Sequence, residues 1–197
     1  MSVPNKDPEH LDRLRDYYAE NRRIPPFQRI AELLGFASKA ASSKLLERLE
    51  SAGFVERTAD DNAWMPTRRF FERPLAANFI RAGAADPIEA SGAEPFLVDD
   101  YVVRTPSRTM MVPVRGDSMV DAGIHDGDMA VVERGTGAKP GDFVVAIVDN
   151  ELTLKELIRE RGRFVLKPHN PAYPVIRPKG ELEIFGVMVG LVRRYAS

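Results

Sequence analysis

The chain has 197 residues, of which 44% are hydrophobic and 29% are charged, and its formal net charge at pH 7 is -1. This composition is typical of globular protein and suffices for one large domain or two small ones. The absence of cysteine excludes disulfides, thiolate metal sites and a cysteine nucleophile. No apolar run approaches the roughly 18 residues that a membrane span needs, and residues 1–7 lack the apolar core of a signal peptide, so we expect a cytoplasmic protein.

Three amphipathic helices are predicted near the N-terminus. Residues 8–21, 27–34 and 39–51 carry apolar side chains at helical spacing. Gly35 ends the second helix as a C-cap, and Ser38 is placed to begin the third as an N-cap. A short helix, a tight turn and a second helix form a helix-turn-helix arrangement.

A hairpin is predicted directly after the helices, from residues 54–58 and 63–67. Residues 1–67 are therefore interpreted as a winged helix-turn-helix domain. Between residues 21 and 50 the chain has six basic and three acidic side chains, so this part is locally basic within a nearly neutral protein. DNA binding is one interpretation, and helices that serve only packing or dimer contacts are the other.

The rest of the chain is predicted to be rich in β-structure. Residues 68–73 contain no clear element and are interpreted as a linker, and Pro74 begins a strand-like segment. A domain of mostly antiparallel, partly closed β-structure is expected over residues 74–197, which gives an α+β protein. The predicted strands are Met110 to Val114, Met129 to Glu133, Asp142 to Val148, Glu151 to Arg159, Arg163 to Lys167 and Ile184 to Val192.

Two residues of the β-domain are candidates for covalent chemistry. Ser118 follows an apolar run and a Gly-Asp pair, so its hydroxyl is expected at a turn where a strand ends. Lys155 is expected within a strand that places Thr153 and Leu157 on the same face. A serine activated by a neutral lysine is a known alternative to the Ser-His-Asp triad, although each residue alone is more often structural.

At these residues the sequence resembles the LexA family of self-cleaving repressors and the wider group of Ser-Lys peptidases that includes UmuD and phage repressors. The matching segments extend over about half of the chain in the same order. They are Gly116-Asp117-Ser118-Met119, Gly123-Ile124-His125-Asp126-Gly127-Asp128, Gly141-Asp142, Lys155, Leu166-Lys167-Pro168-His169-Asn170-Pro171 and Gly186-Val187.

The resemblance implies a function and a set of partners. Proteins of this family dimerise through the β-domain, bind a palindromic operator in double-stranded DNA, and cut themselves when RecA filaments form on single-stranded DNA. Ser118 is then the nucleophile and Lys155 the base. The bond that is cut corresponds here to Ala82-Gly83, in a segment rich in small residues. Such a repressor controls DNA-damage (SOS) response genes.

The helix-turn-helix also resembles that of the LexA family, with two departures. Phe27 stands where the family usually has threonine. The segment that begins the third helix is expected to contact DNA, but the family's Asn-Ala-Ala-Glu-Glu is replaced, which removes acceptors for cytosine and adds a lysine donor. We therefore expect a different operator. The expected DNA-contacting residues are Ser38, Lys39, Ala40, Ala41, Ser42, Ser43 and Lys44.

Other constellations in the sequence are weaker. Asp126 and Asp128 fit a turn better than a metal site because only two ligands are visible, so neither a metal nor a cofactor is expected. The alternatives that stay open are a prophage-type or paralogous self-cleaving repressor, a UmuD-like accessory protein that cleavage activates, and a peptidase acting on other proteins.

Overall fold

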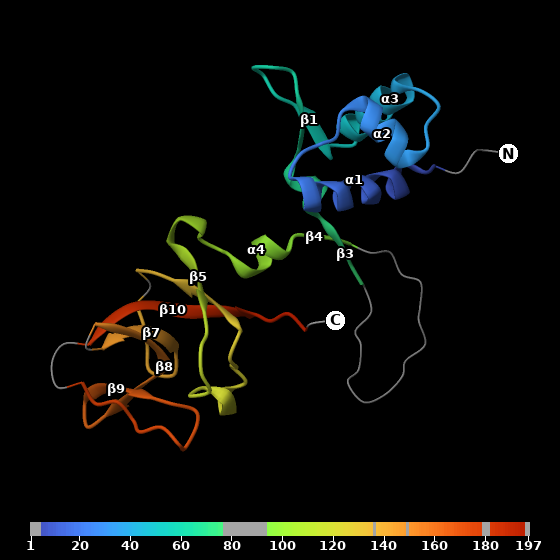
Figure 1. Cartoon of the computed structure of the whole chain (residues 1–197). Coiled ribbons are helices and arrows are strands. Elements are labelled where there is room, and N and C mark those ends of the chain that lie inside the picture. The colour runs from blue at the N-terminus through green and yellow to red at the C-terminus, as the bar shows by residue number, and fades with distance from the viewer. Residues whose placement is uncertain (1–4, 77–93, 136, 149, 179–181, 196–197) are drawn as a thin grey trace. The chain divides into compact units, whose positions relative to one another are not determined.

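The computed structural model describes residues 5–76, 94–135, 137–148, 150–178 and 182–195 (Figure 1). The chain divides into two compact units, residues 1–98 and 99–197. The first unit contains three helices and the second contains a large antiparallel sheet. No helix in the described ranges is long and apolar enough to span a membrane.

The first unit begins with the three predicted helices. They are α1 (Asp7–Asn21), α2 (Phe27–Leu34) and α3 (Lys39–Ser51), which confirms the helices predicted from apolar spacing. Gly35 ends α2 with a left-handed φ of 71°, and the Ser38 side chain accepts a hydrogen bond from the Ala41 N–H at 3.3 Å. The helices pack around one apolar core of Leu11, Leu14, Ile30, Leu34, Leu45, Leu46, Leu49, Val55 and Phe70.

The predicted hairpin after α3 is present as β1 (Val55–Arg57) and β2 (Trp64–Pro66), which pair antiparallel. The Arg57 guanidinium lies 4.1 Å from the centre of the Trp64 ring, a cation–π contact that stiffens the hairpin. Val55 is buried in the core of the helices. The hairpin is therefore anchored to the helices at its base.

The segment 68–73, predicted to be a linker, belongs instead to the first unit. Residues Arg68–Phe71 form a 3-10 helix, and Phe70 is only 1% exposed. The Arg15 side chain donates a hydrogen bond to the Phe70 carbonyl at 2.7 Å. The aromatic pair Phe70-Phe71 was the missed signal, because an apolar ring of this size contributes more when it is buried than in a solvated connection.

A two-stranded antiparallel sheet follows in the first unit, formed by β3 (Arg73–Leu75) and β4 (Glu94–Phe96). Strand β3 confirms only the start of the strand-like segment predicted after Pro74. Ala82 and Gly83, the predicted cleavage site, lie outside the described residues.

The second unit is built on one six-stranded antiparallel sheet in the order β5-β6-β10-β7-β8-β9. Each predicted strand is present to within one residue at either end. Strand β10 therefore lies between the β5-β6 pair and the β7-β8-β9 hairpins (Figure 1). The strands are β5 (Thr109–Pro113), β6 (Met129–Glu133), β7 (Phe143–Val148), β8 (Glu151–Glu160), β9 (Arg163–Lys167) and β10 (Glu183–Val192).

Short helical turns connect parts of this unit: α4 (Val98–Val102), Pro106–Arg108 and Val120–Ala122. Gly186 in β10 allows close approach of the neighbouring strand, because a Cβ there would lie 2.7 Å from Val132 Cγ1 and 2.8 Å from the Glu133 carbonyl oxygen. A side chain at Gly186 would separate β10 from β6. This contact accounts for the glycine in the Gly186-Val187 pair.

Candidate active site and candidate nucleic-acid surface

The structure brings Ser118 and Lys155 together across 37 positions of sequence. Ser118 lies in the turn that follows β5, and Lys155 lies in the middle of β8, opposite Val144 of β7. The Lys155 Nζ is 2.9 Å from the Ser118 Oγ, which is hydrogen-bonding distance. A base and a nucleophile in this arrangement can exchange a proton directly.

The amino group of Lys155 is enclosed by protein. The residue is only 7% exposed, and Nζ also donates to the Thr153 Oγ1 at 3.0 Å and to the Leu154 carbonyl at 2.9 Å. Burial lowers the pKa of Lys155 because the charged ammonium loses the solvation of water. Within the described ranges no carboxylate pairs with this lysine to restore the charged form. The surroundings therefore favour the neutral amine that a base requires.

Leucines of β8 surround Lys155 on both faces of the strand. Leu157 lies on the lysine's own face of β8 and is 1% exposed. Leu152 and Leu154 instead line a cavity of about 300 Å³ that opens beside Ser118, together with Val112 and Val114 from β5 and the residue after it. The cavity has both polar and apolar lining and includes Ser118 and Lys155, so it can hold a peptide next to the hydroxyl and the amine.

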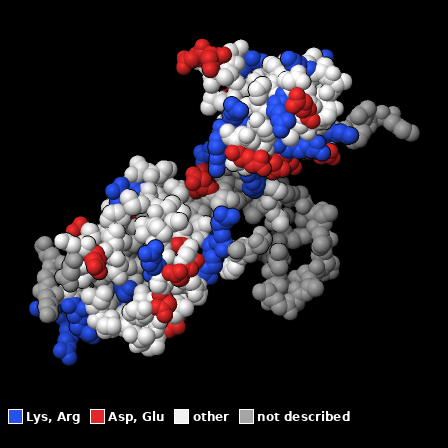
Figure 2. All heavy atoms as spheres, in the orientation of Figure 1, with Lys and Arg blue, Asp and Glu red and all other residues white. Residues whose placement is uncertain are grey.

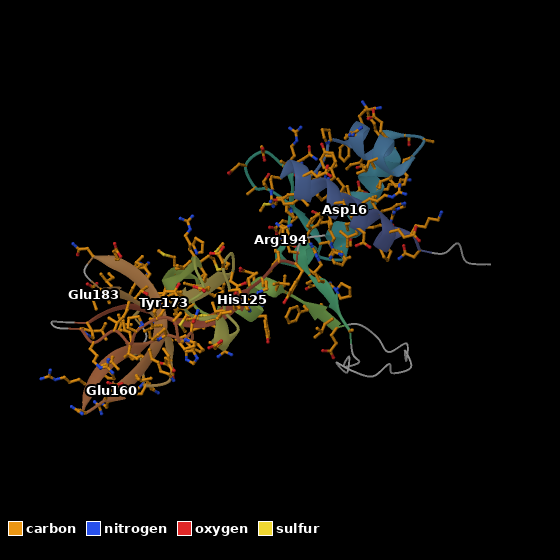
Figure 3. All side chains as sticks on the ribbon, turned by 60° about the horizontal axis from the view of Figure 1, so that its bottom comes forward. Asp16, His125, Glu160, Tyr173, Glu183 and Arg194 are labelled. Atoms are coloured by element: carbon orange, nitrogen blue, oxygen red, sulfur yellow. The ribbon has the colours of Figure 1, made fainter. Side chains whose placement is uncertain are left out.

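The Ser118 turn is held by residues far away in the sequence. The Ser118 carbonyl accepts a hydrogen bond from the His169 N–H at 2.8 Å, and the Asn170 side chain donates to the Asp117 carbonyl at 3.1 Å. The Tyr173 hydroxyl donates to the Asp117 carboxylate, which raises the pKa of the Tyr173 phenol. Tyr173 is labelled in Figure 3. The motif at residues 166–171 was visible in the sequence, but its contact with the nucleophile turn was not.

The two carboxylates considered for a metal site have other partners. Asp126 accepts a hydrogen bond from the Gly116 N–H at 2.6 Å, and Asp128 accepts two from the Arg193 guanidinium. In the part of the chain that is described, no three His, Cys, Asp or Glu side chains are grouped as metal ligands.

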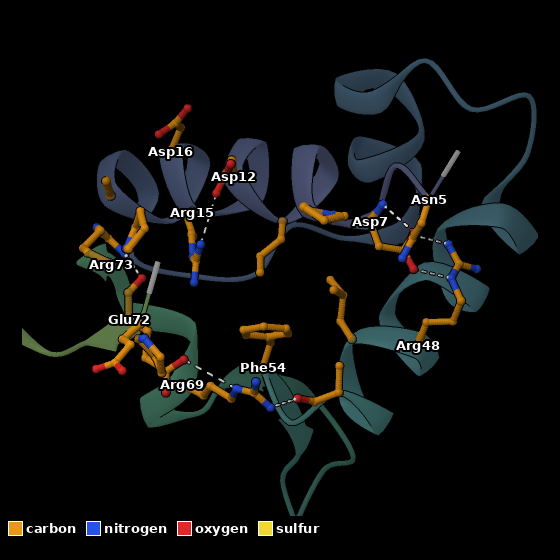
Figure 4. Close-up of a pocket in the computed structure, with 18 residues that line it drawn as sticks. Asn5, Asp7, Asp12, Arg15, Asp16, Arg48, Phe54, Arg69, Glu72 and Arg73 are labelled. Carbon is orange, nitrogen blue, oxygen red and sulfur yellow. Dashed lines mark hydrogen bonds and ion pairs between the residues drawn. The ribbon is translucent and has the colours of Figure 1, made fainter. Parts of the chain in front are cut away.

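A larger cavity of about 780 Å³ lies in the first unit and contains none of the predicted site residues (Figure 4). Its wall includes Phe54, and the guanidinium groups of Arg15 and Arg69 lie 5.7 and 4.8 Å from the centre of that ring. Both arginines also donate to backbone carbonyls, of Phe70 and Ala52 respectively. Arg15 joins α1 to the segment after β2, and Arg69 joins that segment to the end of α3, so both arginines have a structural role.

The segment expected to contact DNA is mostly, but not wholly, accessible. Ser38, Lys39, Ala40 and Lys44 are exposed, and Ala41 and Ser43 are half-buried. Ser42 is the exception, because it is 0% exposed and faces the core of the first unit. The side chain of Ser42 therefore cannot reach a base edge, and we remove it from the expected contacts.

The charges on the first unit do not form a patch of one sign on the face shown in Figure 2, where basic and acidic side chains are mixed. Several arginines of the first unit are paired with acidic side chains, including Arg48 with Asp7 at 2.8 Å and Arg29 with Glu32 at 3.2 Å. Lys39 and Lys44 at the start of α3 are exposed.

Residues 74–189, which include both Ser118 and Lys155, match the family described as Peptidase S24-like. The match extends over most of the second unit, which is therefore a peptidase S24-like domain. A search of curated proteins extends the similarity to nearly the whole chain. The LexA repressor of Opitutus terrae is 40% identical over 192 residues, which cover 93% of this chain and 94% of that protein.

Two further relatives give the same result. LexA repressor 2 of Pseudomonas putida is 36% identical over 92% of this chain and 93% of its own length. LexA repressor 1 of Geobacter sulfurreducens is 36% identical over 90% of each chain. The chain belongs to the LexA repressor family.

Proposed function

We propose that the protein is a transcriptional repressor of DNA-damage response genes that binds a palindromic operator as a dimer and inactivates itself by cutting its own Ala82-Gly83 bond. The observation that carries the proposal is the 2.9 Å contact between the Ser118 hydroxyl and the amine of Lys155, whose pKa is lowered by burial. That pair has no evident structural need for a lysine, since an apolar residue would fill the same space at lower desolvation cost.

The proposed reaction begins with proton transfer from Ser118 to neutral Lys155. The Ser118 Oγ attacks the Ala82 carbonyl carbon, and backbone N–H groups of the Ser118 turn stabilise the oxyanion. The Lys155 ammonium then protonates the Gly83 nitrogen as the C–N bond breaks, which leaves an ester between Ser118 and Ala82. Water hydrolyses this ester with Lys155 again acting as base, so serine and lysine are regenerated.

The DNA-binding part of the proposal rests on the first unit. Three helices followed by a hairpin are the elements of a winged helix-turn-helix, in which the third helix enters the major groove. Lys39, Ala40, Ser43 and Lys44 are the proposed DNA contacts, which their exposed or half-buried side chains support, and Ser38 and Ala41 form the helix start. A single short helix contacts few bases, so specific binding needs two copies of the chain on two half-sites.

The regulatory partner in the proposal is a RecA filament on single-stranded DNA, which stimulates cleavage. A prophage-type or paralogous repressor would use the same chemistry on other genes. A UmuD-like accessory protein is less well supported, because the first unit here is a folded helical domain with its own core. Cleavage would break the chain between β3 and β4, which removes the covalent link between the three helices and the six-stranded sheet and weakens dimeric binding to the operator.

The experiment that tests the proposal uses the purified full-length protein. It is incubated alone at alkaline pH and, separately, near neutral pH with RecA filaments, and the products are followed by gel electrophoresis and by operator binding. We expect two fragments under both conditions and loss of DNA binding as they form. Ser118→Ala is the matched control and should stay intact. An uncut wild-type protein under both conditions would overturn the proposed self-cleavage.

A further inference from the structure

The turn that carries Ser118 is held by a second loop, residues 123–128, which runs beside it before β6. The Gly127 N–H donates to the Val114 carbonyl at 3.0 Å, and the Val114 N–H donates to the Asp128 carbonyl at 2.8 Å. The Gly116 N–H donates to the Asp126 carboxylate at 2.6 Å. Because these bonds lie within a few residues of Ser118, the position of its hydroxyl depends on the position of the loop.

This loop is in turn held by Arg193, the residue that follows β10. Val192 pairs with Met129, so Arg193 lies beside Asp128. Its Nε and Nη2 each donate to one oxygen of the Asp128 carboxylate at 2.6 Å, and Nη2 also donates to the Gly123 carbonyl at 2.6 Å. One guanidinium therefore fixes both ends of the loop.

The carboxylate of Asp128 is the centre of these contacts. It is 2% exposed and also accepts the His125 N–H at 2.7 Å. The hydrogen bonds from Arg193, more than the other contacts, lower the pKa of Asp128 to about 2, so the group is ionised at neutral and alkaline pH. Removing the guanidinium would leave a buried charge without its partner, which forces the loop to move or to admit water.

Because Arg193 follows β10, its ion pair with Asp128 can affect the alignment of Ser118 with Lys155. Ser118 is carried by the β5-β6 side of the sheet and Lys155 by β8, with β10 and β7 between them. Arg193 attaches the loop beside Ser118 to the end of β10, the strand that joins the two sides. A change of about 1 Å in such an alignment can reduce a rate about 100-fold.

We propose that Arg193 and Asp128 are positioning residues that hold the Ser118 hydroxyl in line with Lys155. Neither residue touches the reacting atoms, and both act through the loop 123–128. This inference rests on the proposed self-cleavage.

The test compares Arg193→Gln with wild type in the full-length protein, by the rate of uninduced cleavage across alkaline pH. We expect a rate at least about tenfold lower, with the pH of half-maximal rate unchanged because Lys155 has no contact with the pair. The matched control is Arg177→Gln, which breaks an equally bidentate pair with Glu160 at 3.0 and 3.2 Å. Glu160 lies far from His125 of the loop in Figure 3. The control should cleave like wild type.

A second measurement examines Ser118 without the cleavage segment. A fluorophosphonate transfers its phosphonyl group to the Ser118 Oγ and releases fluoride, with the hydroxyl proton passing to Lys155. Labelling of Arg193→Gln should slow by a factor similar to that for cleavage. A double variant, Asp128→Asn with Arg193→Gln, replaces the ion pair by a neutral hydrogen-bonded pair and should recover part of the rate. Circular dichroism gives the folded fraction, to which every rate is referred.

The outcomes separate the two levels of inference. If wild type does not cleave, the proposed function fails. If wild type cleaves and Arg193→Gln keeps the rate of Arg177→Gln, the positioning role alone is wrong. If Arg193→Gln does not fold, Arg193→Lys decides, since it keeps the charge but loses the two-pronged contact. A wild-type rate for folded Arg193→Lys would then overturn the positioning role.

Discussion

The burial of Lys155 leads to a prediction about how self-cleavage depends on pH. Only the neutral amine can accept the Ser118 proton, and burial lowers the pKa of Lys155 in the folded protein. The cleavage rate without an activator should therefore rise with pH and reach a plateau once the pH exceeds that pKa. Below the plateau the neutral fraction grows about tenfold for each pH unit, so the logarithm of the rate should rise with a slope of about one.

The same lysine should make the free energy of unfolding depend on pH. The unfolded chain releases the proton of Lys155 only near the ordinary value of about 10.4, whereas the folded protein releases it at a lower pH. Between these two values the unfolded state binds one more proton, so stability rises with pH by about 1.4 kcal/mol per unit. Below the folded-state pKa the full cost of burying the charge is present. Lys155→Met should remove this pH dependence, so its stability relative to wild type falls as the pH rises through the window.

The assay follows loss of intact protein between about pH 6 and about pH 11 at constant ionic strength, with denaturant unfolding curves at the same pH values. Lys155→Arg is the matched variant for cleavage, because it keeps a cation that cannot lose its proton in this range and should stay inactive at every pH. A flat rate profile in folded wild-type protein, or cleavage by Lys155→Arg, would refute a neutral-lysine base.

Four further outcomes follow from the site and the first unit. Ser118→Ala should abolish cleavage while leaving thermal stability and DNA binding near wild type, because it removes one hydroxyl from the turn; residual cleavage would exclude Ser118 as nucleophile. Mass spectrometry should give fragments that end at Ala82 and begin at Gly83, and Gly83→Leu should slow cleavage, with any other terminus showing that the site is wrong. Exchanging Ala40 to Lys44 for Asn-Ala-Ala-Glu-Glu should shift DNA preference toward the usual family operator, measured by binding to both operators, and an unchanged preference would contradict base contact by this segment. Ser42→Ala should raise the free energy of unfolding by about 1 kcal/mol, measured by denaturant titration, because among the described residues the buried Ser42 hydroxyl has no hydrogen-bond partner; a loss of stability would point to a bonded hydroxyl.

Much of the fold was predictable because local signals and packing agree. The ends of α2 and α3 follow from Gly35 and Ser38, which satisfy the backbone at a helix end wherever the helix is placed. The six strands of the second unit were predictable because β-branched runs are separated by clear turn residues. The Ser118–Lys155 pair was predicted only through the resemblance, since the sequence alone could not show that β8 turns Lys155 toward the β5 turn.

Other features depend on packing that no local pattern records. Ser42 was expected on the DNA side because it lies among exposed residues, but the helical repeat places it on the face with Leu45, Leu46 and Leu49. The family's motif has alanine at this position, which suits a buried site. Arg193 was not predicted at all, because its partner Asp128 is 65 positions away and only the pairing of β10 with β6 brings them together.

Burying Lys155 lowers the stability of the folded protein, and the surrounding sheet compensates for that loss. A buried lysine destabilises the folded protein below its pKa, and three hydrogen bonds, to Ser118, Thr153 and Leu154, offset only part of that cost. The remainder is met by the apolar core of the sheet, where Val144 and Leu157 are fully or almost fully buried next to the lysine. A substitution that weakens this core should therefore let water reach Lys155, raise its pKa and slow cleavage near neutral pH, even though it touches neither reacting atom. Val144→Ala tests this step: we expect a cleavage profile displaced to higher pH with an unchanged plateau, and an unshifted profile in folded protein would show that the core does not set the basicity of the lysine.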